Sequence, residues 1–119
     1  MENFKDIFTR LKKNLTQFKK GIVVQNSTED NYYLNTNTEF NKKPMFFAAV
    51  AIKKNYVSYY LMPVYTNPAL LKGISPALKK KMQGKSCFNF KTIDEDLFKE
   101  LGDLTKKGYE SFKKEGFIK

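Results

Sequence analysis

The pattern of apolar and polar positions predicts an amphipathic helix near each end of the chain. In both places apolar residues recur at three- and four-residue steps, which is typical of a helix that packs on a core. The first stripe consists of Phe4, Ile7, Phe8, Leu11, Leu15 and Phe18. The second consists of Leu97, Phe98, Leu101, Leu104 and Phe112. We expect Gly21 to end the first helix, and a capping box of Thr92 and Glu95 to begin the last one.

Between these helices, short runs of strand-forming residues predict a sheet. Residues 22–25 and 32–36 are rich in strand formers and are joined by a polar loop, so a hairpin is the simplest interpretation. From Met45 to Ile52 both alternating sets are apolar, which predicts a strand that is covered on both faces. Two further alternating segments, Tyr56 to Met62 and Ser86 to Phe90, complete about five strands.

Strict alternation assigns the two faces of the central strand. It places one set of side chains on one face: Met45, Phe47, Ala49 and Ala51. It places the other set on the opposite face: Phe46, Ala48, Val50 and Ile52. In the following strand, Tyr56, Ser58 and Tyr60 share a face whose mixture of hydroxyls and rings suits partial contact with water.

Two short helices are predicted before the last strand, because Asn67 and Ser75 each stand directly before a proline and can cap a helix that the proline begins. The second should run from Pro76 to about Met82. The resulting order predicts one α+β domain over residues 1–119, with a mostly antiparallel sheet of about five strands packed by the N-terminal and C-terminal helices. We expect the two long helices to clamp the sheet between them, which leaves only its lysine-bearing rim for recognition.

Composition narrows the possible functions. The chain has 119 residues, 22 basic and 12 acidic side chains and a net charge of +10, which favours anionic partners. It has no histidine, so Ser-His-Asp and Cys-His catalytic sites and His-rich metal sites are excluded. The single cysteine, Cys87, is expected to be a buried and inert thiol. The longest apolar run has eight residues, whereas a membrane-spanning helix needs about twenty. We therefore expect a cytoplasmic, non-catalytic protein without membrane insertion and without a cofactor.

One group of residues is a candidate binding site. Tyr56, Ser58 and Tyr60 share a strand face, Lys53 lies at the start of that strand, and Lys85 precedes the last strand. If these strands are neighbours, hydroxyl and ammonium groups surround one end of the sheet. Pockets commonly combine an apolar lining with a few such polar groups, although tyrosines on a sheet often pack under a helix instead. The expected occupant is a small anionic ligand or a protein partner.

Several segments resemble the YdhG-like family of small bacterial domains of unknown function. The similar segments are Phe47-Ala48-Ala49, residues 53–60, residues 78–82 and residues 84–90. They lie in the last two-thirds of the chain and follow one another in the family's order. The resemblance implies a frataxin-like α+β fold. It also implies intracellular iron handling as an alternative function. The family's Tyr-Gly-Met-Pro-like element is replaced here by residues 35–43, so any function of that element is not implied.

Two alternative functions therefore remain open. Asp96, Glu100 and Asp103 share a face of the last helix by their spacing, and such hard oxygen ligands can hold iron weakly, although acids in the first turns of a helix also complement its dipole. Non-specific nucleic-acid binding is the other alternative, through the basic face of the first helix: Lys5, Arg10, Lys12, Lys13, Lys19 and Lys20. Only one basic residue is an arginine, which disfavours specific reading of bases. We expect a monomer or a weak homodimer.

Overall fold

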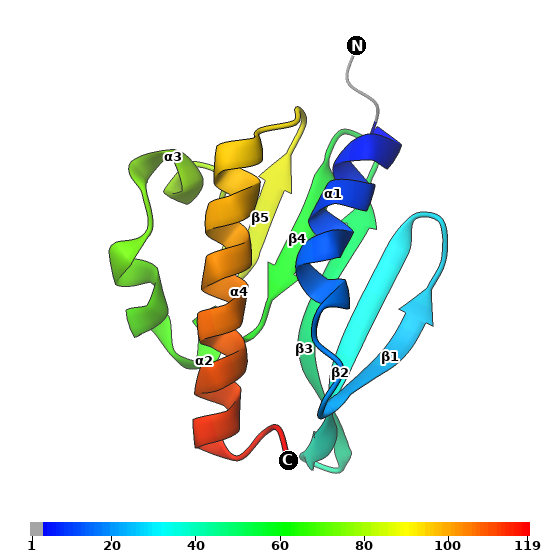
Figure 1. Cartoon of the computed structure of the whole chain (residues 1–119), viewed down its shortest axis with the longest axis vertical. Helices are drawn as coiled ribbons and strands as arrows, with labels where there is room; N and C mark the ends of the chain where they lie inside the picture. The colour runs from blue at the N-terminus through cyan, green and yellow to red at the C-terminus, as the bar shows by residue number, and fades with distance from the viewer. Residues whose placement is uncertain (1–3) are drawn as a thin grey trace.

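An antiparallel sheet occupies the centre of the computed structural model, which describes residues 4–119 (Figure 1). Its strands are β1 Ile22–Ser27, β2 Asn31–Phe40, β3 Lys43–Ile52, β4 Val57–Leu61 and β5 Cys87–Phe90. The long helices are α1 Phe4–Thr16 and α4 Glu95–Glu115. Three short helices connect β4 to β5, namely α2 Pro63–Thr66, the 3-10 helix η1 Pro68–Gly73 and α3 Pro76–Lys79. The predicted α+β class, with five antiparallel strands and a helix towards each end of the chain, is confirmed.

The strands lie in the sheet in the order of the chain, β1-β2-β3-β4-β5, and every neighbouring pair is antiparallel. The segment after α3 runs along the outer edge of β5. There the backbone carbonyl of Lys81 accepts a hydrogen bond from the Asn89 amide at 2.8 Å, and the Gln83 amide donates to the carbonyl of Cys87 at 2.9 Å. These bonds cover much of the edge that β5 would otherwise expose.

A β-bulge in β3 changes which side chains face the helices. Ala48 lies opposite Leu34, but the next paired residues are Phe46 and Asn35, so Phe47 is the extra residue of the bulge. Phe47 therefore joins Ala48 in the core, and Phe46 turns to the other face. The strict alternation predicted for this strand is wrong at this point, because a single inserted residue reverses the side-chain pattern on one side of it.

Both long helices cover the same face of the sheet, which we call the covered face. The Phe47 ring shows this directly, because it contacts Phe18 just beyond α1 and also Tyr109 and Phe112 of α4, with ring centroids 5.7, 6.0 and 5.9 Å away. The hydroxyl of Tyr59 on β4 lies 2.7 Å from the Thr105 hydroxyl of α4. The core therefore lies between the helices and this one face.

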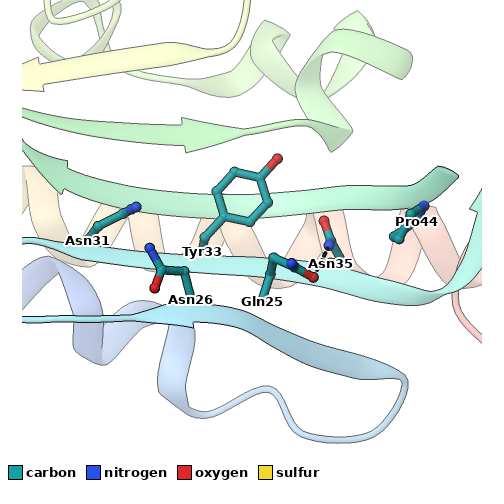
Figure 2. A pocket seen from close by; sticks show the side chains of 6 residues that line it. All are labelled: Gln25, Asn26, Asn31, Tyr33, Asn35 and Pro44. Atoms are coloured by element: carbon teal, nitrogen blue, oxygen red, sulfur yellow. Dashed lines mark hydrogen bonds between the residues drawn. The ribbon is translucent and has the colours of Figure 1, made fainter.

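The two helices also contact each other (Figure 1). The Asn14 amide of α1 donates to the Phe98 carbonyl of α4 at 3.0 Å, and Arg10 forms an ion pair with Glu95. The prediction that the helices clamp the sheet between them is therefore wrong. Among residues 4–119, no helix packs on the opposite side of the sheet, which we call the open face (Figures 1 and 2).

The predicted helix caps are only partly correct. Ser75 caps α3 as expected, since its hydroxyl accepts from the Leu78 amide at 3.1 Å, but α3 ends at Lys79 because the following residues pair with β5. Asn67 makes no side-chain cap, because its amide donates to the Ser111 hydroxyl of α4 instead. The capping box predicted at Thr92 is also wrong. The cap of α4 is Asp94, whose carboxylate accepts from the amide three residues later at 3.2 Å.

In the part of the chain that the structure describes, no helix combines the length and the apolar character that crossing a bilayer requires.

Candidate functional site on the open face

Two rows of side chains cross the open face, each row running from β2 to β5. The strand register places the members of a row directly opposite one another. The first row is Tyr33, Ala49, Tyr60 and Cys87. The second row is Asn31, Ala51, Ser58 and Asn89. The open face therefore carries aromatic rings and amides, with small alanines on β3 between them.

The large side chains of these rows cover the small ones. Ala49 is only 2% exposed and Ser58 only 1%, although no described helix lies over them. Figure 2 shows the ring of Tyr33 lying across β3, and this ring stacks on Phe46 with centroids 4.7 Å apart. The predicted burial of both faces of β3 is thus found, but on the open face it comes from side chains of the sheet itself. The rings form the outer surface there.

An amide-rich hollow lies at the β1–β2 side of the open face (Figure 2). It is lined by Gln25, Asn26, Asn31, Tyr33, Asn35 and Pro44. The Asn35 amide nitrogen donates to the side-chain oxygen of Gln25 at 3.1 Å. Amide groups offer both donors and acceptors, so this hollow suits a polar, uncharged group such as the edge of a nucleobase.

A second hollow, which we call the lysine hollow, lies at the other end of the rows. It is lined by Tyr56, Lys80, Lys81, Met82, Gln83, Asn89, Lys91 and Thr92. Three of these described residues are lysines and none is acidic. Val57 pairs with Phe90, so Tyr56 directly before β4 lies opposite Lys91 directly after β5. Uncompensated ammonium groups around one hollow produce a positive potential that attracts an anion.

Asn89 connects the lysine hollow to the second row. Its side-chain oxygen accepts from the Ser58 hydroxyl at 2.7 Å, and its amide nitrogen donates to the side chain of Gln83 at 2.5 Å. The Cys87 thiol lies 3.3 Å from the same oxygen. These bonds fix the orientation of Asn89, so the two parts of the open face form one continuous surface.

The structure brings four of the five predicted binding residues to the same side of the sheet. Ser58 and Tyr60 lie on the open face of β4, and the Lys53 ammonium lies 5.9 Å from the centre of the Tyr60 ring. Tyr56 lies in the lysine hollow. Lys85 does not join them. The carbonyl of Ser86 accepts from the Leu61 amide, so Lys85 lies beyond the far end of β4.

The lysine opposite Tyr56 is Lys91, which was not among the predicted binding residues. In an antiparallel pair the second strand runs backwards, so the end of β5, and not its beginning, lies beside the start of β4. Lys80, Lys81 and Asn89 also line the hollow without having been predicted. Lys91 could have been found by extending the β4–β5 register one residue back from Val57. Lys80 and Lys81 could not, because no clear sequence signal shows the path of the segment after α3.

The acidic residues proposed as metal ligands do not form a cluster. The Glu100 carboxylate accepts hydrogen bonds from the backbone amide and the hydroxyl of Ser75, at 2.6 and 2.7 Å, and so holds the start of α3 against α4. Asp96 and Asp103 are exposed. Within residues 4–119, no three histidine, cysteine or acidic side chains gather closely enough to hold a metal ion.

Part of the basic face of α1 is engaged within the protein. Arg10, the only arginine of the chain, pairs with Glu95, and the Lys12 ammonium lies 4.8 Å from the centre of the Tyr32 ring. Charges used in this way contribute less to binding an external polyanion. The nucleic-acid alternative is thus less favoured on α1 than the sequence alone indicates.

Cys87 is half-buried beside Ser58, Tyr60 and Lys53. Burial raises the pKa of its thiol, and the neighbouring Ser58 and Tyr60 side chains and the charge of Lys53 oppose the shift only in part. We therefore expect iodoacetamide to alkylate Cys87 more slowly at pH 7.5 than it alkylates a cysteine in an unfolded peptide, because less of the thiol is ionised and reachable. Mass spectrometry measures the rate without ambiguity, because the chain has one cysteine. In guanidinium chloride the alkylation rate should rise to that of the peptide. If the folded protein already reacts as fast as the peptide, the expectation is wrong.

No protein-family model matches the chain, and neither a curated protein nor a solved structure matches it. The resemblance to YdhG-like domains therefore stays a prediction.

Proposed function

We propose that this protein is a non-catalytic binding domain and that the lysine hollow receives the phosphate group of its ligand. The observation that carries the proposal is the meeting of Lys80, Lys81 and Lys91 around one hollow whose described lining contains no carboxylate. Tyr56 and Gln83 add groups that donate hydrogen bonds to an anion. A phosphate would relieve the mutual repulsion of the three ammonium groups.

The alternative of iron handling has less support from the geometry. Its three acids lie apart, and Glu100 is already bound to Ser75. The positive charge of the whole chain also lowers the local concentration of cations. The lysine hollow, by contrast, concentrates anions and lies on the surface that the helices leave open.

The test is the binding of pyrophosphate to a variant in which Lys80, Lys81 and Lys91 are all replaced by glutamine. Each exposed charge pair contributes up to about 1 kcal/mol, so the dissociation constant should rise about tenfold or more. Isothermal titration calorimetry at low salt measures it. Glutamine keeps most of the length of the side chain, so the packing of the hollow should change little.

A matched control removes three lysines from elsewhere on the surface. Lys106, Lys107 and Lys114 line another hollow on α4, which also contains Glu110. Their replacement by glutamine lowers the net charge equally and should change the affinity less than the first variant does. Equal losses in the two variants would mean that pyrophosphate responds to overall charge alone, and the proposed site would be wrong.

A further inference from the structure

We infer that the ligand is single-stranded nucleic acid, whose phosphates lie in the lysine hollow and whose bases stack on the rings of the open face. This inference rests on the proposed function, because it names the molecule that carries the phosphate. It moves the nucleic-acid interface from α1, where the sequence placed it, to the opposite side of the sheet.

The first support is continuity between charge and aromatic rings. Asn89 lines the lysine hollow and also stands in the second row, beside Ser58. Tyr60 lies two residues beyond Ser58 on β4, in the first row. Because a strand rises about 3.3 Å per residue, Tyr56 and Tyr60 lie about 13 Å apart along β4. A chain held by its backbone at one end of this surface therefore needs only a few nucleotides to reach the rings.

The second support is the set of half-buried rings on the open face: Tyr33, Phe46 and Tyr60. Proteins that bind single strands commonly offer such rings on a sheet, because every base has an aromatic face and stacks without regard to sequence. Tyr33 and Phe46 are already stacked at an interplanar angle of 29°, so their pair is fixed before any ligand arrives.

The third support is the polar composition around the rings. The amide-rich hollow beside Tyr33 can donate to and accept from the edges of unpaired bases. Lys53 adds a positive charge beside Tyr60, and neither row contains an acidic residue. A protein partner is less expected at this face, since the centres of protein interfaces are depleted of charge.

These features favour a single strand over a duplex. Rings on a sheet can stack on the faces of bases only when the bases are unpaired. Lysine binds phosphate mainly as a point charge, so the lysine hollow does not itself select a base sequence. Binding should therefore depend on single-stranded character and on salt, with little dependence on sequence.

The experiment measures fluorescence anisotropy of a labelled ten-nucleotide oligo-dT and oligo-rU with the full chain at low salt. Replacing Tyr60 by leucine should weaken binding about tenfold, whereas replacing it by phenylalanine keeps the ring and should change the affinity less than about twofold. The triple glutamine variant of the lysine hollow should reduce the slope of log K against log salt by about 2, since three phosphate contacts are lost. A duplex of the same length should compete more weakly than the single strand.

The outcomes separate this inference from the proposed function. If pyrophosphate binding needs the three lysines but oligonucleotides bind equally well to the Tyr60 leucine variant, the inference fails and the phosphate site stands. If neither probe depends on the lysines, both fail. Equal affinity for the duplex would also overturn the inference, because stacking would not contribute. A third result would overturn it as well. If the native protein binds no oligonucleotide but self-associates in sedimentation experiments, and the leucine variant does not self-associate, the open face is an interface between copies of the chain.

Discussion

Replacing Phe47 by alanine should lower the free energy of unfolding by about 3–5 kcal/mol, the usual cost of removing a buried phenylalanine ring. Phe47 is 0% exposed, and its ring lies where α1, α4 and the sheet meet, in contact with Phe18, Tyr109 and Phe112. The vacated space cannot close easily, because these neighbours belong to separate elements. Urea unfolding followed by circular dichroism measures the change.

The adjacent Phe46 provides the control. It has the same side chain on the same strand, but the bulge turns it to the open face, where it is only half-buried against Tyr33. Phe46 to alanine should therefore cost less than about 1.5 kcal/mol, the scale of one aromatic pair. If the two variants lose equal stability, the bulge is misplaced and both faces of β3 are core.

Replacing Thr105 by valine should cost about 1–3 kcal/mol, because it leaves a buried hydroxyl without its acceptor. The Thr105 hydroxyl donates to the Leu101 carbonyl at 2.7 Å, so its single proton is used there. The Tyr59 hydroxyl, 2.7 Å away, must therefore donate to Thr105. Tyr59 is fully buried, and burial raises the pKa of its phenol, which stays protonated at neutral pH.

A double-mutant cycle distinguishes this bond from general packing. Tyr59 to phenylalanine removes the stranded hydroxyl, so adding Thr105 to valine in that background should cost about 1 kcal/mol less than it costs alone. Unfolding curves of the four proteins give the coupling energy. Strictly additive losses would show that the two hydroxyls do not interact.

The class of the fold followed from residue periodicity, because burial of one face imposes a repeat that survives in the sequence. The apolar stripe beginning at Phe4 and the strand runs at Met45 and Tyr56 all became the expected kinds of element. The side of the sheet on which each helix packs leaves no such repeat. In β3, alanines on the solvent side of the sheet are buried under larger neighbouring side chains. Such a strand has the same apolar pattern as a strand covered by helices on both faces.

The candidate site was predictable only where residues belong to one strand. Ser58 and Tyr60 were placed correctly because alternation along a strand is a local property. Lys85 was misplaced and Lys91 missed because their positions depend on the direction of the partner strand. The bulge at Phe47 was missed for a related reason, since both of its neighbours are as apolar as it is and no polar residue marks the change of face.

The succession of strands in chain order has a consequence for how the molecule forms. The pairs β1–β2, β2–β3 and β3–β4 join segments that are close in sequence, so these four strands can assemble hairpin by hairpin with short loop closures, whereas residues 62–86 separate β4 from β5. The docking of α1 on α4, exemplified by Arg10 and Glu95, instead closes a loop of most of the chain. We expect the rate-limiting event of folding to be this late meeting of the helices, by which time the strands that carry the outward-facing rings already stand in register.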